Sequence, residues 1–121
     1  ERAVAAEDPV LVYTIPSFQN PTGRTLPLER REAVASIAAR HGLWVIEDDP
    51  YGELRYDGGP LPPIAGMAPA ADRTLALSTL SKIAAPGLRI GWVRAPRVMR
   101  EAAQIDISAG LGAVNYAADK S

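Results

Sequence analysis

The chain has 121 residues, of which 47% are hydrophobic and 22% charged, and its formal net charge is -1. This length is enough for one globular core and short for two, and scattered charges without a basic surplus exclude a surface that tracks nucleic acid. There is no cysteine, which excludes disulfides and thiolate metal sites, and no apolar run approaches the ~20 residues that span a bilayer.

These properties, and a start without the order of charges typical of a signal peptide, predict a cytoplasmic chain. We expect a small-molecule partner, and we expect no metal, nucleic acid or membrane partner.

The first half of the chain predicts a strand, a helix and a second strand. Residues 10–15, VLVYTI, are a β-branched and aromatic run of the kind that forms a strand. Residues 28–41 carry apolar positions at helical spacing, after Pro27 and before Gly42, which suit a helix start and stop. Residues 43–49, LWVIEDD, are apolar up to an acidic end, which is typical of a parallel strand buried on both faces.

The second half predicts a loop, two strands and a helix. Residues 58–70 are rich in Gly and Pro and indicate an irregular loop over the surface. Residues 74–80 and 88–95 resemble strands, and the few residues between them are too short for a parallel crossover, so the second strand should be antiparallel. Residues 96–109 read as a helix. Together these elements predict one α/β unit with a mostly parallel sheet and one antiparallel strand.

Polar clusters follow three of the predicted strands, where open parallel sheets bind ligands. Each cluster alone has a simpler interpretation. Asn-Pro-Thr-Gly is typical of a turn, paired aspartates cap or solvate a strand end, and a single lysine is usually a surface residue. Their joint placement at successive strand ends favours a ligand site formed by Asn20, residues 48–51 and residues 79–82.

An aldehyde cofactor with a phosphate and a pyridine ring requires this set of side chains. A lysine amine forms a Schiff base with the aldehyde, a carboxylate keeps the ring nitrogen protonated, and hydroxyls with an arginine bind the phosphate. Strand alternation places Asp48 and Asp49 on opposite faces, so one aspartate at most points to a ligand on a given face. The Asp-x-x-Tyr spacing selects Asp48.

Three stretches in this order, YTIPSFQNPTG, VIEDDPYGELRY and STLSKIAAPGLRIGW, resemble the class I/II aminotransferases, which are fold-type-I pyridoxal-phosphate enzymes. The resemblance extends to about Gln104. It implies a three-layer α/β sandwich, the cofactor pyridoxal 5'-phosphate, and transfer of an amino group from an amino acid to a 2-oxo acid. It also implies that residues 1–121 are the central part of the large, cofactor-binding domain of a longer chain, whose parent is a homodimer. The subgroup with similar sequence motifs acts on 2-aminoadipate, aromatic or branched amino acids. The resemblance does not select one amino-acid substrate among these.

The resemblance also assigns roles to individual residues. Lys82 would be the Schiff-base lysine and the acid/base of transamination, and Asp48 would pair with the pyridinium nitrogen. Tyr51 and Asn20 would bind the phenolic oxygen, with Asn20 near the substrate carboxylate as well. The predicted phosphate ligands are Thr79, Ser81 and Arg89. We also expect a cis Asn20-Pro21 bond.

Two other functions compete with this one. Transcriptional regulators that fuse an aminotransferase-like effector domain to a helix-turn-helix typically read His-Gln-Phe or His-Gln-Tyr before Pro-Thr-Gly, and Glu-Asp-Asp-Tyr-Asp after the second strand. Here FQNPTG and EDDPYGEL favour an enzyme. A non-catalytic α/β binding domain with an incidental lysine would require all three clusters to be coincidence.

Overall fold

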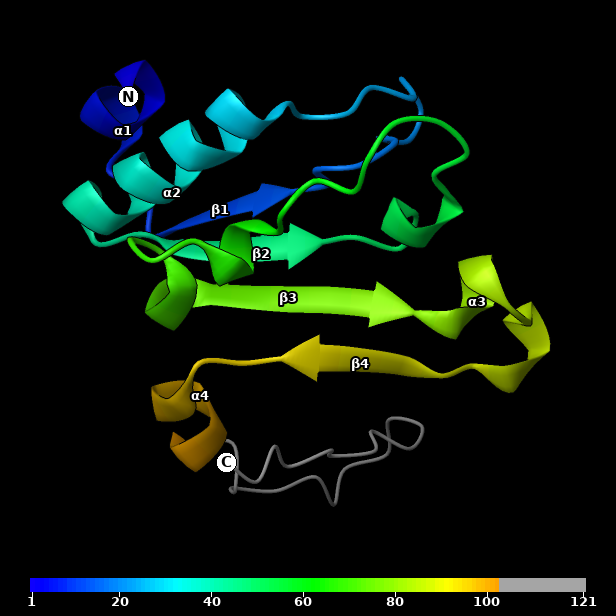
Figure 1. Cartoon of the computed structure of the whole chain (residues 1–121). Helices are drawn as coiled ribbons and strands as arrows, with labels where there is room; N and C mark the ends of the chain where they lie inside the picture. The colour runs from blue at the N-terminus through cyan, green and yellow to red at the C-terminus, as the bar shows by residue number, and fades with distance from the viewer. Residues whose placement is uncertain (103–121) are drawn as a thin grey trace.

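A four-stranded mixed sheet organises residues 1–102, the part of the chain that the computed structural model describes (Figure 1). The strand order is β1 (Leu11–Thr14), β2 (Trp44–Asp48), β3 (Thr74–Thr79) and β4 (Gly91–Arg94). The first three strands are parallel, and β4 is antiparallel to β3. This arrangement confirms the predicted α/β class with a mostly parallel sheet and one antiparallel strand.

The predicted helix between the first two strands is α2 (Leu28–His41), and it ends at Gly42 as expected. Gly42 has φ 68°, and its N–H donates to the carbonyls of Ala38 and Ala39, which closes the last turn. The sequence did not predict α1 (Arg2–Glu7). No helix within residues 1–102 has the length and apolar character needed to cross a membrane.

The other helices are short. They are α3 (Leu80–Ile83), α4 (Arg97–Ala102) and four 3-10 turns, η1 (Gly52–Leu54), η2 (Ile64–Gly66), η3 (Ala71–Arg73) and η4 (Pro86–Leu88). The helix predicted over 96–109 is confirmed as far as Ala102, and the rest of that prediction lies outside the described residues.

Two predictions for the second half of the chain are wrong. The last strand begins at Gly91 rather than at residue 88, because η4 occupies the preceding residues and Arg89 adopts a left-handed φ of 52°. The Gly- and Pro-rich segment is not a surface loop throughout, since Ile64 and Ala65 in η2 are buried. Both of their N–H groups donate to the carboxylate of Glu47, at 2.8 and 2.9 Å, and this holds the segment against β2.

The core lies between one face of the sheet and α2. The buried cluster comprises Ala35, Ala38, Leu43, Val45, Ile64 and Ala70, and Val4 of α1 packs against it. Figure 1 shows α1 near one end of α2. Small alanines on α2 allow the helix to approach the sheet closely. The described residues therefore supply the sheet and one helical layer of the sandwich.

The other face of the sheet is less covered than the sequence predicts. In β2, Val45 and Glu47 are buried, whereas Trp44, Ile46 and Asp48 are only half-buried, so residues 1–102 do not bury this strand on both faces. The adjoining strand β1 exposes Tyr13 by 54%.

Candidate active site

The carboxyl ends of β1, β2 and β3 lie at one edge of the sheet, because the three strands are parallel (Figure 1). From β1 the chain enters the loop that carries Asn20. At the end of β2 it passes Asp48 and then Tyr51, and from β3 it enters α3, which carries Lys82. The three predicted segments thus meet at the same edge.

Lys82 extends from the short helix that directly follows β3. Thr79 caps this helix, because its hydroxyl oxygen accepts a hydrogen bond from the Ser81 N–H at 3.1 Å. The Lys82 side chain is exposed, and none of residues 1–102 supplies its amine with a hydrogen-bond or ion-pair partner. The amine is therefore accessible to a small molecule at this edge.

The three predicted phosphate ligands lie on adjoining segments. The carbonyl of Ile90 accepts two hydrogen bonds, from the Thr79 hydroxyl at 2.8 Å and from the Leu80 N–H at 3.0 Å. These bonds hold Arg89, which precedes Ile90, beside the end of β3, and its side chain is exposed. Because the Thr79 hydroxyl donates its one hydrogen to Ile90, it can donate to a phosphate only after that bond breaks. Ser81 and Arg89 carry no such restriction.

Asp48 contacts a residue that sequence reasoning missed. The Tyr13 hydroxyl donates a hydrogen bond of 2.5 Å to Asp48 Oδ2. This bond is the main cause of a raised Tyr13 pKa, and burial and the negative charge of Asp48 add to it. No local signal in the sequence could have found Tyr13, because its contact with Asp48 depends on the register of β1 and β2. Tyr13 pairs with Ile46, so it lies on the same sheet face as Asp48.

Asp49 contacts a different part of the molecule. Its Oδ2 accepts a hydrogen bond from the Ser17 hydroxyl at 3.3 Å, and its backbone carbonyl accepts one from the Ser78 hydroxyl at 3.0 Å. Asp49 Oδ1 is buried and has no hydrogen-bond partner within residues 1–102. The adjacent carboxylates of Asp48 and Asp49 thus have separate partners.

A buried arginine, also missed by sequence reasoning, holds both ends of the loop that contains Asn20. Arg31 of α2 is 1% exposed. Its guanidinium donates to the carbonyls of Leu26, Pro16 and Pro62 at 2.9–3.2 Å and to the Ser17 hydroxyl at 3.0 Å. Burial lowers the pKa of Arg31, and the negative charges of Glu47 and Asp49 oppose that shift.

The Asn20 side chain itself is exposed at the tip of this loop. The Asn20-Pro21 peptide bond is cis, as predicted. Among residues 1–102, no hydrogen bond joins the side chains of Asn20, Asp48 and Tyr51, so the two predicted ligands of the phenolic oxygen are not hydrogen-bonded to each other.

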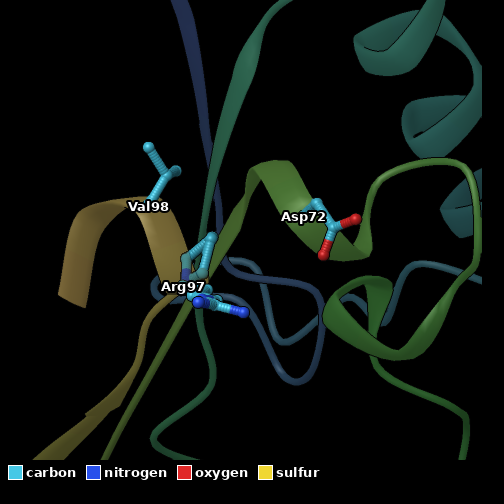
Figure 2. Close-up of a pocket in the computed structure, with 4 residues that line it drawn as sticks. Asp72, Arg97 and Val98 are labelled. Atoms are coloured by element: carbon cyan, nitrogen blue, oxygen red, sulfur yellow. The ribbon is translucent and has the colours of Figure 1, made fainter. Parts of the chain in front are cut away.

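A hollow of about 340 Å³ lies away from this edge and contains none of the predicted site residues. It is lined by Asp72 of η3, which precedes β3, and by Pro96, Arg97 and Val98, which follow β4 (Figure 2). Since β4 is antiparallel to β3, these segments lie at the opposite end of β3 from Lys82.

Comparison with known proteins identifies relatives of this arrangement. The family model described as aminotransferase class I and II matches residues 2–117. An aromatic-amino-acid aminotransferase of Thermococcus litoralis is 47% identical over 92 residues, covering 75% of this chain and 22% of the relative. The crystal structure of an alpha-aminoadipate aminotransferase of Thermus thermophilus, complexed with N-(5'-phosphopyridoxyl)-L-leucine, matches with a TM-score of 0.70 and 37% identity. The matched region is 78% of this chain and 25% of the chain in that crystal structure.

A regulator is also related. An uncharacterized HTH-type transcriptional regulator of Bacillus subtilis is 39% identical over 103 residues, covering 84% of this chain and 21% of the regulator. The chain thus spans between a fifth and a quarter of the relatives described here. The family match covers nearly every residue, and the fold and the ordered strand ends agree with it. The chain belongs to the class I and II aminotransferase family.

Proposed function

We propose that this chain is the central part of the cofactor-binding domain of a pyridoxal-phosphate-dependent aminotransferase, which transfers an amino group from an amino acid to a 2-oxo acid. One observation carries the proposal. The Asn20 loop, Asp48 and the Lys82 helix follow three parallel strands at one sheet edge. An exposed amine, a half-buried carboxylate, hydroxyls and an exposed guanidinium are the donor set that this cofactor requires.

Each residue has a part in the proposal. Lys82 binds the cofactor aldehyde through Nζ and later moves a proton, and Asp48 holds the proton of the pyridine nitrogen. Ser81 and Arg89 bind the phosphate, together with Thr79 once its hydroxyl leaves Ile90. Tyr51 and Asn20 bind the phenolic oxygen, and Asn20 also lies near the substrate carboxylate. When bound, the cofactor supplies an electron sink for the substrate carbon.

The wider properties of the parent are part of the same proposal. Its substrates are small amino and 2-oxo acids, and the names of the relatives favour an aromatic amino acid or 2-aminoadipate as amino donor. We propose a homodimer, as in the family, and a cytoplasmic location, which agrees with a chain of 121 residues that contains no cysteine.

Borohydride trapping of the full-length parent protein tests the role of Lys82. With pyridoxal phosphate added, the protein should absorb in the visible, and reduction should fix the cofactor to one lysine. This stretch contains only Lys82 and Lys120, so peptide mass mapping separates them. Lys82→Ala should abolish the adduct, whereas Lys120→Ala should retain it. A colourless protein, or an adduct on another lysine with Lys82 free, contradicts the proposal.

A regulatory effector domain is the second candidate, because of the related Bacillus subtilis regulator. Cofactor binding alone does not separate the two functions, so the discriminating measurement is the formation of a 2-oxo acid. The full-length protein, incubated with an aromatic amino acid or 2-aminoadipate and 2-oxoglutarate, should release the corresponding 2-oxo acid over many turnovers. Tight cofactor binding without turnover on any amino acid favours the regulator.

A further inference from the structure

Tyr13 and Asp48 form a side-chain hydrogen bond at the candidate site across 35 residues of sequence. Tyr13 comes from β1 and Asp48 from β2, and the parallel register places them on the same sheet face. A bond from a hydroxyl to a carboxylate is charge-assisted and belongs to the stronger class of hydrogen bonds. The nearby face is half-exposed, so neither side chain is held by burial alone.

The bond gives the two carboxylate oxygens of Asp48 different surroundings. Asp48 Oδ2 accepts from the phenol, whereas Oδ1 has no hydrogen-bond partner among residues 1–102. The terminal torsion of an aspartate is broad, so an unanchored carboxylate at a strand end samples many orientations. A partner on one oxygen fixes the carboxylate plane, and a donated hydrogen bond also favours the charged form.

We infer that Tyr13 is a positioning residue that holds Asp48 through Oδ2, so that Oδ1 faces the pyridine nitrogen of the cofactor. This inference rests on the proposed function, since it assigns Asp48 to that nitrogen. Tyr13 itself touches neither the substrate nor the reacting atoms. Its hydroxyl acts through Asp48, and Tyr13→Phe removes that hydroxyl while it keeps the ring.

The Tyr13→Phe variant of the full-length protein separates the hydroxyl from the ring. Loss of the bond should weaken pyridoxal-phosphate binding about tenfold, the size expected for one hydrogen bond to a charged group. The effect should vanish in an Asp48→Ala background, because a double-mutant cycle removes a contribution that depends on the partner. Tyr56→Phe is the matched control. Tyr56 is 98% exposed, and its variant should bind the cofactor as the wild type does.

A second readout needs no cofactor. In the apoprotein, the ultraviolet difference between wild type and Tyr13→Phe isolates the ionisation of this phenol, which should occur at higher pH than that of an ordinary tyrosine. The Asp48→Ala variant should return the Tyr13 titration to the ordinary range. A merely structural tyrosine would not follow the substitution of Asp48.

The possible results distinguish a failure of the role inferred for Tyr13 from a failure of the proposed aminotransferase function. If wild type binds the cofactor and Tyr13→Phe binds it equally well, the inference is overturned and the proposed function stands. Equal weakening by Tyr13→Phe with and without Asp48 also overturns it, because the hydroxyl then acts by another route. If wild type does not bind pyridoxal phosphate at all, the proposed function fails and the inference fails with it.

Discussion

Asp48 and Asp49 are neighbours in the chain, yet the fold gives their carboxylates different surroundings. Asp48 lies on the half-exposed sheet face and accepts a hydrogen bond from Tyr13. Asp49 accepts one from Ser17, whose hydroxyl also binds the buried guanidinium of Arg31. We propose the Asp48 carboxylate as a cofactor ligand, whereas the Asp49 carboxylate connects the strand end to the Asn20 loop.

Substituting each aspartate by asparagine tests this division. In the full-length protein, Asp48→Asn should remove the proposed carboxylate partner of the pyridine nitrogen, a charge pair that the bound cofactor would bury, so we expect a loss of ~3–5 kcal/mol, or roughly two to four decades in kcat. Asp49→Asn should lower the melting temperature and change kcat far less. Steady-state kinetics and thermal unfolding measure both. Equal losses of kcat at the two positions would show that the assignment of sheet faces is wrong.

The raised pKa of Tyr13 predicts a pH-dependent contribution to stability. The hydrogen bond to Asp48, followed by burial, favours the neutral phenol in the folded state. The contribution is therefore fully present below pH 10.0, the ordinary value, and is lost as the pH rises through the higher folded pKa. The difference in melting temperature between wild type and Tyr13→Phe should hold constant up to about pH 10 and disappear above the folded pKa. A difference that grows with pH has the wrong sign for this contact.

At the scale of elements, α2 does more than cover the sheet. Its buried side includes Arg31 beside Ala35 and Ala38, so a charged group lies within the layer that packs on the strands. The guanidinium binds carbonyls from both ends of the loop between β1 and α2, and from Pro62 before η2. The helix therefore fixes the loop that carries Asn20.

Arg31→Met should destabilise the protein by about 3 kcal/mol, because it leaves several buried acceptors without a donor. Arg30→Met is the matched control, since Arg30 is exposed on the same helix and its substitution should change stability by less than about 0.5 kcal/mol. Thermal unfolding of the full-length protein compares them. Matching melting temperatures for the two variants would exclude Arg31 as an anchor of the loop.

In the molecule as a whole, residues 1–102 form a sheet with helices over one face. The candidate site lies at the sheet edge formed by the carboxyl ends of the parallel strands, and most of its candidate cofactor ligands are exposed there. Lys82 and Arg89 both project at that edge, and Tyr13 is more than half exposed. The chain covers between a fifth and a quarter of the relatives described above, and we propose that segments outside it supply further contacts to the cofactor.

We therefore expect the 121-residue chain to bind pyridoxal phosphate at least about a hundredfold more weakly than the full-length protein, which corresponds to a loss of roughly 2.7 kcal/mol. Titration followed by visible absorbance measures both affinities. Equal affinity in the two proteins would mean that residues 1–121 hold a complete cofactor site.

Most of the local elements and their order, though not α1, could be predicted from the sequence. The β-branched run of β1, the apolar spacing of α2 and the acidic end of β2 are local periodicities, so each could be predicted from adjacent residues alone. Because parallel strands place their carboxyl ends at one edge, this order also predicted that the segments carrying Asn20, Asp48 and Lys82 follow strands at that edge. The short link to β4 likewise predicted its antiparallel direction.

The burial of polar groups and the contacts between distant residues could not be predicted, because both arise from the folded packing of the chain. Arg31 on a helix and Glu47 in a strand both suit solvent by composition, but each is 1% exposed. The fold supplies Arg31 with carbonyl acceptors and supplies Glu47 with the N–H groups of η2, which offsets the cost of burying each charge. The Tyr13–Asp48 bond likewise depends on the register of β1 and β2. Register and burial arise from contacts between residues far apart in the chain, and local periodicity carries no information about those contacts.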